Sequence, residues 1–173
     1  EKMPAHPPNP MALDFESLNL TEIIRLQNQL SALLARRFEK TLALAFSDVT
    51  GSTAYFARFG NEAGRRLQQR HVDLIVKSLE GSSGRIVDTV GDGVFLCFPQ
   101  VETAVEVLSG FQTLRLQENS HLPLEHHMTT RIGIHWGTVL TDGVIVTGDP
   151  VNLCAKFAAT GQPTEIRITK PAF

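Results

Sequence analysis

The sequence lacks the usual signs of secreted, membrane-spanning and nucleic-acid-binding proteins. It has only two cysteines, Cys97 and Cys154, and both lie in apolar segments, so we expect buried free thiols rather than a disulfide framework. No apolar run approaches the roughly 20 residues that span a bilayer. The net charge of −2 gives no basic face of the kind that nucleic acids need. These absences predict a cytoplasmic location, with no nucleic-acid partner and no membrane segment.

The sequence also has no internal repeat, no signal-peptide pattern and no initiator methionine. Because it starts at Glu1, we expect a piece of a longer protein in which an input domain precedes this residue. The 173 residues, of which 42% are hydrophobic and 20% charged, have the composition of a globular protein. A chain of this length can bury the core of one domain and carry a short extension.

Residues 1–40 predict a proline-rich linker followed by an amphipathic helix. The stretch "EKMPAHPPNP" carries four of the nine prolines and is expected to be irregular. Asn19 is the predicted N-cap of the helix, with Glu22 completing a capping box. Apolar residues then repeat at alternating steps of four and three, as in a coiled-coil seam: Ile23, Leu26, Leu30 and Leu33. A helix packed on its own domain and a parallel two-helix stalk both fit this short seam, and the stalk is favoured.

Residues 41–173 predict one α+β domain. The apolar run at 41–49 is typical of a central strand. A helix broken near "RFGNEAG" follows, with Val72, Ile75, Val76 and Leu79 on one face. The remaining predicted elements are a hairpin around "GDG" at 85–98, a helix at 101–118, a hairpin turning at Asp142-Gly143, a helix with Asp149 as N-cap, and a strand at 165–169. This order indicates a ferredoxin-like (βαββαβ-type) antiparallel sandwich with its helices on one face.

Two carboxylates carry the first indication of chemistry. Asp48 ends the central strand and Asp92 lies in the first hairpin turn, so both reach one sheet edge if the two strands are neighbours. Carboxylates beside a backbone carbonyl suit Mg²⁺ or Mn²⁺. The "TGST" that follows Asp48 brings small residues to a helix start, where free amides favour phosphate. Nucleotide phosphoryl chemistry fits this pattern. Aspartates that only form turns fit it as well.

Four motifs, in this order and spacing, resemble those of the class III nucleotidyl (adenylyl/guanylyl) cyclase catalytic domain. They are "AFSDVTGST", "VDTVGDGV", "RIGIHWG" and "GDPVNLCAKFAATGQPTEIRIT", and the resemblance covers residues 41–169. It implies the cyclase fold, ATP or GTP as substrate, two Mg²⁺ or Mn²⁺ ions per site, and a head-to-tail homodimer. Each active site of such a dimer is assembled from both subunits.

The resemblance also implies a role for each matching residue. Asp48, Asp92 and the backbone carbonyl of Val49 match the metal ligands. The phosphate-binding positions are Gly51, Ser52, Thr53 and Arg131. Asn152 matches the asparagine that orients the ribose from the partner chain. Asp88 and Ile145 stand at the two base-reading positions.

The sequence departs from the family pattern at four places. Lys156 stands where the family has its transition-state arginine, and a lysine lacks the planar fork that holds two phosphate oxygens. Asp88 stands where adenylyl cyclases have lysine and guanylyl cyclases glutamate. Ile145 replaces a second reader that is Asp or Thr in adenylyl cyclases. The chain also ends at Phe173, before the family's C-terminal hairpin with its phosphate-binding lysine.

Two functions of different classes therefore remain open. The first is a metal-dependent enzyme that converts ATP or GTP to the 3′,5′-cyclic monophosphate and pyrophosphate in signal transduction, and the two aspartates favour it. The second is a catalytically degenerate cyclase fold that dimerises, binds nucleotide and passes on a signal. Lys156, Ile145 and Asp88 favour this second function.

Overall fold

The computed structural model describes residues 14–173, and the linker predicted for residues 1–10 lies outside this range. The chain divides into two compact units between Arg37 and Phe38. None of the helices in the described range is long and apolar enough to cross a bilayer. Cys97 and Cys154 are both free and buried, as predicted.

The first unit contains all but the last residue of the helix α1 (Leu20–Phe38), which follows a short 3₁₀ turn at Phe15–Ser17. Its capping box is confirmed: the Asn19 N–H donates to Glu22 Oε2 over 2.8 Å, and the Glu22 N–H donates to Asn19 Oδ1 over 3.1 Å. No residue of α1 is buried. Within this unit nothing covers the apolar seam, and Leu30 is 51% exposed.

The second unit is built on a mostly antiparallel sheet in the strand order β2-β3-β1-β4-β5, and β6 pairs with β4 as its one parallel pair. The strands are β1 (Glu39–Val49), β2 (Arg85–Val90), β3 (Gly93–Phe98), β4 (Thr130–Thr141), β5 (Val146–Thr147) and β6 (Ile166–Ile168). The predicted element order is confirmed. β1 begins two residues before the expected Thr41.

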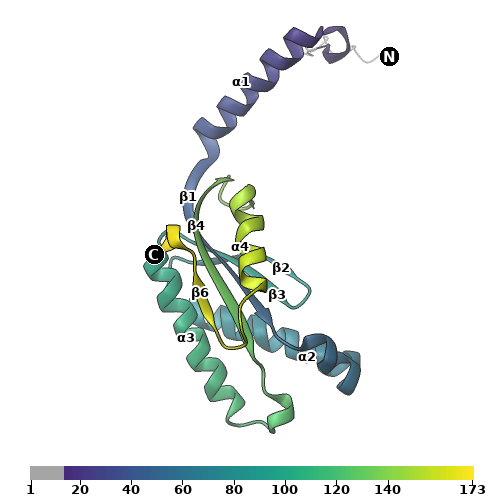
Figure 1. Ribbon diagram of the computed structural model, residues 1–173, viewed down its shortest axis with the longest axis vertical. Coiled ribbons are helices and arrows are strands. Elements are labelled where there is room, and N and C mark those ends of the chain that lie inside the picture. Colours follow the sequence, from purple (N-terminus) through teal and green to yellow (C-terminus); the bar gives the residue numbers. More distant parts are fainter. Residues whose placement is uncertain (1–13) are drawn as a thin grey trace, which may run out of the picture. The chain divides into compact units, whose positions relative to one another are not determined.

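The helices cover both faces of the sheet, so the prediction of one covered face is wrong (Figure 1). The three helices are α2 (Ser52–Leu79), α3 (Val101–Asn119) and α4 (Asp149–Ala159). Ala43 and Ala45 of β1 pack with α2 and α3. Leu44, which points to the other face of the pleat, packs with Cys154 of α4.

The helix α2 bends at Gly60, where φ is +84° and ψ 172°, and this confirms the predicted interruption. Its buried residues after the bend are Gly64, Leu67, His71 and Ile75. The core face thus advances in steps of three and four residues, which leaves Val76 a hundred degrees away from Ile75. Val76 is 49% exposed, so its placement on the core face is wrong.

The helix α4 lies close against β4 because two glycines of "RIGIHWG" leave room for it. A Cβ built on Gly133 would meet the Ala158 Cα at 2.7 Å and its Cβ at 2.8 Å. A Cβ on Gly137 would meet Pro150 Cβ at 2.7 Å. The N-cap of α4 is Gly148, at φ +138°, and not Asp149 as predicted.

This close approach predicts the effect of adding one methyl group. Gly133→Ala should lower the free energy of unfolding by about 1–3 kcal/mol, because α4 must shift away from the sheet. Gly110→Ala is the matched control: a Cβ there meets nothing within 4 Å, and alanine favours the helix by up to about 1 kcal/mol. Urea unfolding followed by circular dichroism measures both changes. Equal stability of the two variants would contradict this packing.

Candidate active site

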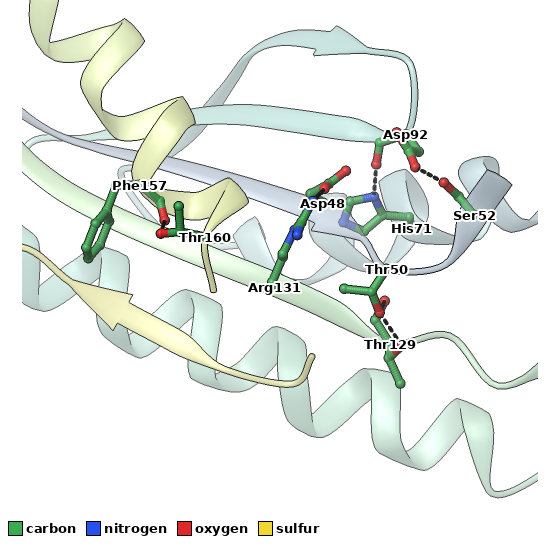
Figure 2. Close-up of polar contacts among 9 residues, drawn as sticks. All are labelled: Asp48, Thr50, Ser52, His71, Asp92, Thr129, Arg131, Phe157 and Thr160. Atoms are coloured by element: carbon green, nitrogen blue, oxygen red, sulfur yellow. Dashed lines mark hydrogen bonds and ion pairs between the residues drawn. The ribbon is translucent and has the colours of Figure 1, made fainter. Parts of the chain in front are cut away.

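The residues predicted to bind metal and phosphate gather at one end of the central strand. In the sheet, Asp48 of β1 pairs with Gly93 of β3 on one side and with Arg131 of β4 on the other. The turn that carries Asp92 precedes Gly93, so both aspartates reach the same edge (Figure 2). A cavity of about 340 Å³ is lined there by Asp48, Val49, Thr50, Gly51, Ser52, Thr53, Asp92 and Arg131.

Asp48 is paired with Arg131 across the two strands. Arg131 Nη2 and Nε donate to the same oxygen, Oδ2 of Asp48, over 2.8 and 3.1 Å. Burial raises the pKa of the Asp48 carboxyl above its ordinary value; the Arg131 hydrogen bond lowers it, and the charge of Asp92 raises it again. The two carboxylates therefore repel each other, and a cation bound between them would relieve that repulsion.

Asp92 is held by donors from α2. The Ser52 hydroxyl donates to Asp92 Oδ2, and the backbone carbonyl of Asp92 lies 3.1 Å from Nδ1 of His71 (Figure 2). Gly91 adopts φ +60°, which lets the chain reverse in two residues between β2 and β3. The hairpin predicted around "GDG" is confirmed, with Gly93 already in β3.

The predicted phosphate-binding turn ends β1 and begins α2. Gly51 is the N-cap of α2 in the left-handed conformation, at φ +72°, and no side chain caps this helix. The first amides of a helix have no intrahelical partner, so those of Ser52 and Thr53 suit an anion. Thr50 anchors the turn to Thr129. The Thr50 N–H donates to the Thr129 carbonyl over 2.8 Å, and the hydroxyls of Thr50 and Thr129 lie 2.5 Å apart.

The donor set at this edge fits Mg²⁺ or Mn²⁺ bound together with a substrate. Between residues 14 and 173, no three His, Cys, Asp or Glu side chains gather in the way that a preformed metal centre requires. Mg²⁺ in proteins is commonly held by one or two carboxylates plus substrate phosphates. Asp48 and Asp92 match that pattern, and the phosphate turn lies beside them.

The two predicted base-reading residues line a second hollow, of about 360 Å³. Its wall includes the stacked rings of Phe46 and Phe95, whose centroids are 4.6 Å apart. Asp88 and Ile145 come from strand regions at opposite edges of the sheet order, so the sheet must curl to bring them together. Arg85 Nη1 bridges the two edges by donating to the Val144 carbonyl over 3.0 Å.

The side chains of this hollow are mostly apolar. Asp88 is exposed, and its Oδ1 accepts the Thr89 N–H over 2.7 Å. Ile145 is 61% exposed, and its N–H donates to Asp142 Oδ1 over 3.0 Å. The carboxylate of Asp88 is thus the acidic group that a base would meet beside an apolar wall.

Asn152 and Lys156 lie apart from the cavity of Asp48. They are four residues apart on α4 and both exposed, whereas Cys154 and Ala158 form the buried side of the helix. Neither Asn152 nor Lys156 lines the cavity of Asp48 in the single chain. One chain alone therefore does not bring all of these residues together in a single site.

Arg131 and Ser52, both predicted as phosphate-binding residues, bond to Asp48 and Asp92, which was not predicted, and two further contacts at the site were not predicted from the sequence either. The first is His71, whose ring contacts Ser47 and the Asp92 carbonyl. A signal for it exists: His71 falls on the core stripe of α2, four residues from both Leu67 and Ile75. The second is the hydrogen bond of Thr50 to Thr129, for which the sequence gives no signal.

Comparison with known proteins agrees with this geometry. Residues 34–173 match the family model of the adenylate and guanylate cyclase catalytic domain. The putative adenylate cyclase 3 of Rhizobium meliloti (strain 1021) is 24% identical over 127 residues, which make up 73% of this chain and 22% of that protein. The chain thus spans less than a quarter of the length of the curated relatives it matches.

Two solved structures share the fold. The adenylate/guanylate cyclase/hydrolase of Silicibacter pomeroyi is 25% identical, with a TM-score of 0.66 over 76% of this chain and 77% of that one. The guanylate cyclase domain of RhGC from Catenaria anguillulae, solved in complex with GTP, is 18% identical, with a TM-score of 0.64 over 78% of this chain and 81% of that one. The match over residues 34–173, on a fold shared with these structures, shows that the chain belongs to the adenylate and guanylate cyclase catalytic domain family.

Proposed function

We propose that the protein is a purine nucleoside triphosphate cyclase that acts in signal transduction. It converts ATP or GTP to the 3′,5′-cyclic monophosphate and pyrophosphate: the 3′-hydroxyl loses its proton, its oxygen bonds to the α-phosphorus, and the bond from that phosphorus to the pyrophosphate oxygen breaks. One observation carries the proposal, namely that both aspartates, the phosphate turn and Arg131 line a single cavity. The family match and the GTP complex of the Catenaria domain support a nucleotide substrate.

Asp48, Asp92 and the carbonyl of Val49 would hold two Mg²⁺ or Mn²⁺ ions. When bound, such ions lower the pKa of the 3′-hydroxyl and neutralise charge on the phosphates. Ser52 and the carbonyl contact of His71 hold Asp92 in place before the ions arrive. Arg131 already screens one oxygen of Asp48, and its remaining donors can turn to the phosphates.

The other half of each active site would come from a second copy of the chain. Asn152 and Lys156 are exposed on α4 and do not reach the cavity of their own chain, which supports a head-to-tail homodimer. Asn152 would orient the ribose of the nucleotide. Lys156 would stabilise negative charge on the transferring phosphate. It carries the same single positive charge as an arginine but lacks the planar fork that holds two phosphate oxygens. The symmetry of the dimer gives two equivalent sites.

The open apolar seam of α1 supports a parallel helical stalk between the two copies. Such a stalk would transmit the state of an input domain that precedes Glu1. We place the domain in the cytoplasm, where its nucleotide substrates are found.

A second function is a cyclase fold that binds nucleotide and regulates without turnover. The apolar Ile145 in the second hollow favours it, because this side chain offers no hydrogen bond to a base. Lys156 favours it as well, because a lysine lacks the planar fork that holds two phosphate oxygens. Both functions share the fold and the dimer, so turnover alone separates them.

Asp48→Asn provides the first test of the proposed enzyme. It should lower cyclic-nucleotide production with Mn²⁺ by about a hundredfold or more, because a neutral amide is a poor ligand for a hard cation. The Asp48 side chain is 28% exposed and loses charge-assisted bonds to Arg131, so the free energy of unfolding should fall by no more than about 3 kcal/mol. Asp73→Asn, which alters an exposed carboxylate on α2, is the matched control and should keep full activity.

Product is measured with ATP and with GTP, each with Mg²⁺ and with Mn²⁺. Full activity in Asp48→Asn contradicts the metal assignment. No product from wild-type dimer in any of the four mixtures assigns the protein to the regulatory function.

Asp88→Lys tests base selection. Guanine presents two N–H donors to a carboxylate, whereas adenine presents an acceptor at N1, so the wild type should bind GTP more tightly than ATP. A mismatched polar contact costs about 1–3 kcal/mol, which predicts a preference of about ten- to a hundredfold. Asp88→Lys should move that preference toward ATP. Calorimetry with Ca²⁺ in place of the catalytic metal measures the affinities.

Thr89→Lys is the control for the added charge. It places the same lysine one residue along β2, on the opposite face of the strand. It should leave the ratio of the two affinities unchanged. Equal binding of ATP and GTP by wild type and Asp88→Lys would show that Asp88 does not read the base.

A further inference from the structure

His71 is the most deeply buried histidine of the described chain, at 1% exposure, although it belongs to a helix with a largely polar surface. Its ring sits at the meeting point of α2, β1 and the β2–β3 turn. Nε2 lies 2.8 Å from the Ser47 hydroxyl, and Nδ1 lies 3.1 Å from the backbone carbonyl of Asp92. A buried polar ring with both nitrogens engaged is satisfied by these two contacts.

The partners of His71 fix the hydrogen on its ring. A carbonyl only accepts, so Nδ1 carries the hydrogen and donates to Asp92. Nε2 is then an acceptor, and the Ser47 hydroxyl donates to it. The ring is neutral in this arrangement, and burial lowers the pKa of His71 to about 4, which agrees with it. A neutral ring ties the two chain segments together without adding a positive charge next to the carboxylates.

Each of these contacts lies directly beside a metal-binding candidate. Ser47 is fully buried and precedes Asp48 in β1. The other contact is the main chain of Asp92 itself, in a turn of two residues (Figure 2). One imidazole therefore spans the gap between the strand that carries the first carboxylate and the turn that carries the second.

We propose that His71 is a positioning residue that sets the spacing of Asp48 and Asp92 by bonding to Ser47 and to the Asp92 carbonyl. The inference rests on the proposed function, in which the two aspartates bind metal. Groups that orient metal ligands commonly change metal affinity by about 10- to 100-fold when they are removed. Loss of the ring contacts should therefore weaken metal binding while the nucleotide contacts of the phosphate turn stay in place.

His71→Phe, His71→Asn and His135→Phe separate this role from simple packing. Phenylalanine keeps a ring in the core but makes neither hydrogen bond. Asparagine keeps an N–H near the position of Nδ1 and so keeps the bond to the Asp92 carbonyl. His135 is also buried, at 7% exposure, and its Nδ1 contacts Thr169 Oγ1 at 2.8 Å, away from the aspartates. His135→Phe is thus the matched control.

Mn²⁺ binding to each protein is followed by electron paramagnetic resonance with an α,β-methylene nucleotide that cannot be cyclised, and hydrogen exchange is measured over residues 90–94. In His71→Phe, the Mn²⁺ dissociation constant should rise by about tenfold or more, and the turn should exchange faster. Nucleotide affinity at saturating Mn²⁺ should change by less than about threefold, since no phosphate contact is removed. His71→Asn should recover much of the loss, and His135→Phe should match the wild type.

Wild-type Mn²⁺ affinity or wild-type exchange of the turn in His71→Phe overturns the positioning role. An equal loss in His135→Phe overturns it too, because general core damage then explains the effect. If the wild-type protein binds no Mn²⁺ with nucleotide, the metal site of the proposed function fails, and that result is distinct from a variant that binds as well as the wild type.

Discussion

The crowding of two carboxylates at one end of β1 is the constraint on which the rest of the site depends. Burial and the neighbouring Asp92 both raise the pKa of Asp48, so the pair is costly without compensation. Donors from two other elements supply that compensation: Arg131 from β4 donates to the Asp48 carboxylate, and Ser52 from α2 donates to the Asp92 carboxylate. The same edge carries the amides at the start of α2, so the surroundings favour a cation and the phosphates that accompany it.

Much of this arrangement follows from local rules of sequence. Turn chemistry predicts the capping box of Asn19 and the chain reversal at Gly91. Apolar spacing predicts the succession of helices and strands along the chain. The face of the sheet that α4 covers could not be predicted in this way. Periodicity shows which residues are buried, but it does not show which element they pack against. His71 was missed for a similar reason: its partners lie 24 and 21 residues away, and a histidine on a core stripe gives no sign of them.

The departures from the family pattern at Lys156, Asp88 and Ile145 fall at the predicted transition-state and base-reading positions. Lys156 is exposed on α4, and Ile145 lies in the apolar hollow on the far side of the sheet from α2 and α3. The cavity of Asp48 and Asp92, by contrast, is lined by all seven residues that match the family's metal ligands and phosphate-binding positions. In the proposed enzyme, the base-reading and transition-state positions therefore depart more from the family pattern than the metal and phosphate positions do, which would lower selectivity and rate before it abolished the reaction.

The sharing of each site between two chains is tested most directly by mixing two inactive variants. Asp48→Ala removes a proposed metal ligand and Asn152→Ala removes the proposed ribose contact, so each homodimer should be inactive. In an equal mixture that exchanges subunits, half of the dimers contain one intact site, and about a quarter of the wild-type activity should return. No recovery above the separate variants, in a mixture shown to contain heterodimer and with an active wild type, would contradict a shared site.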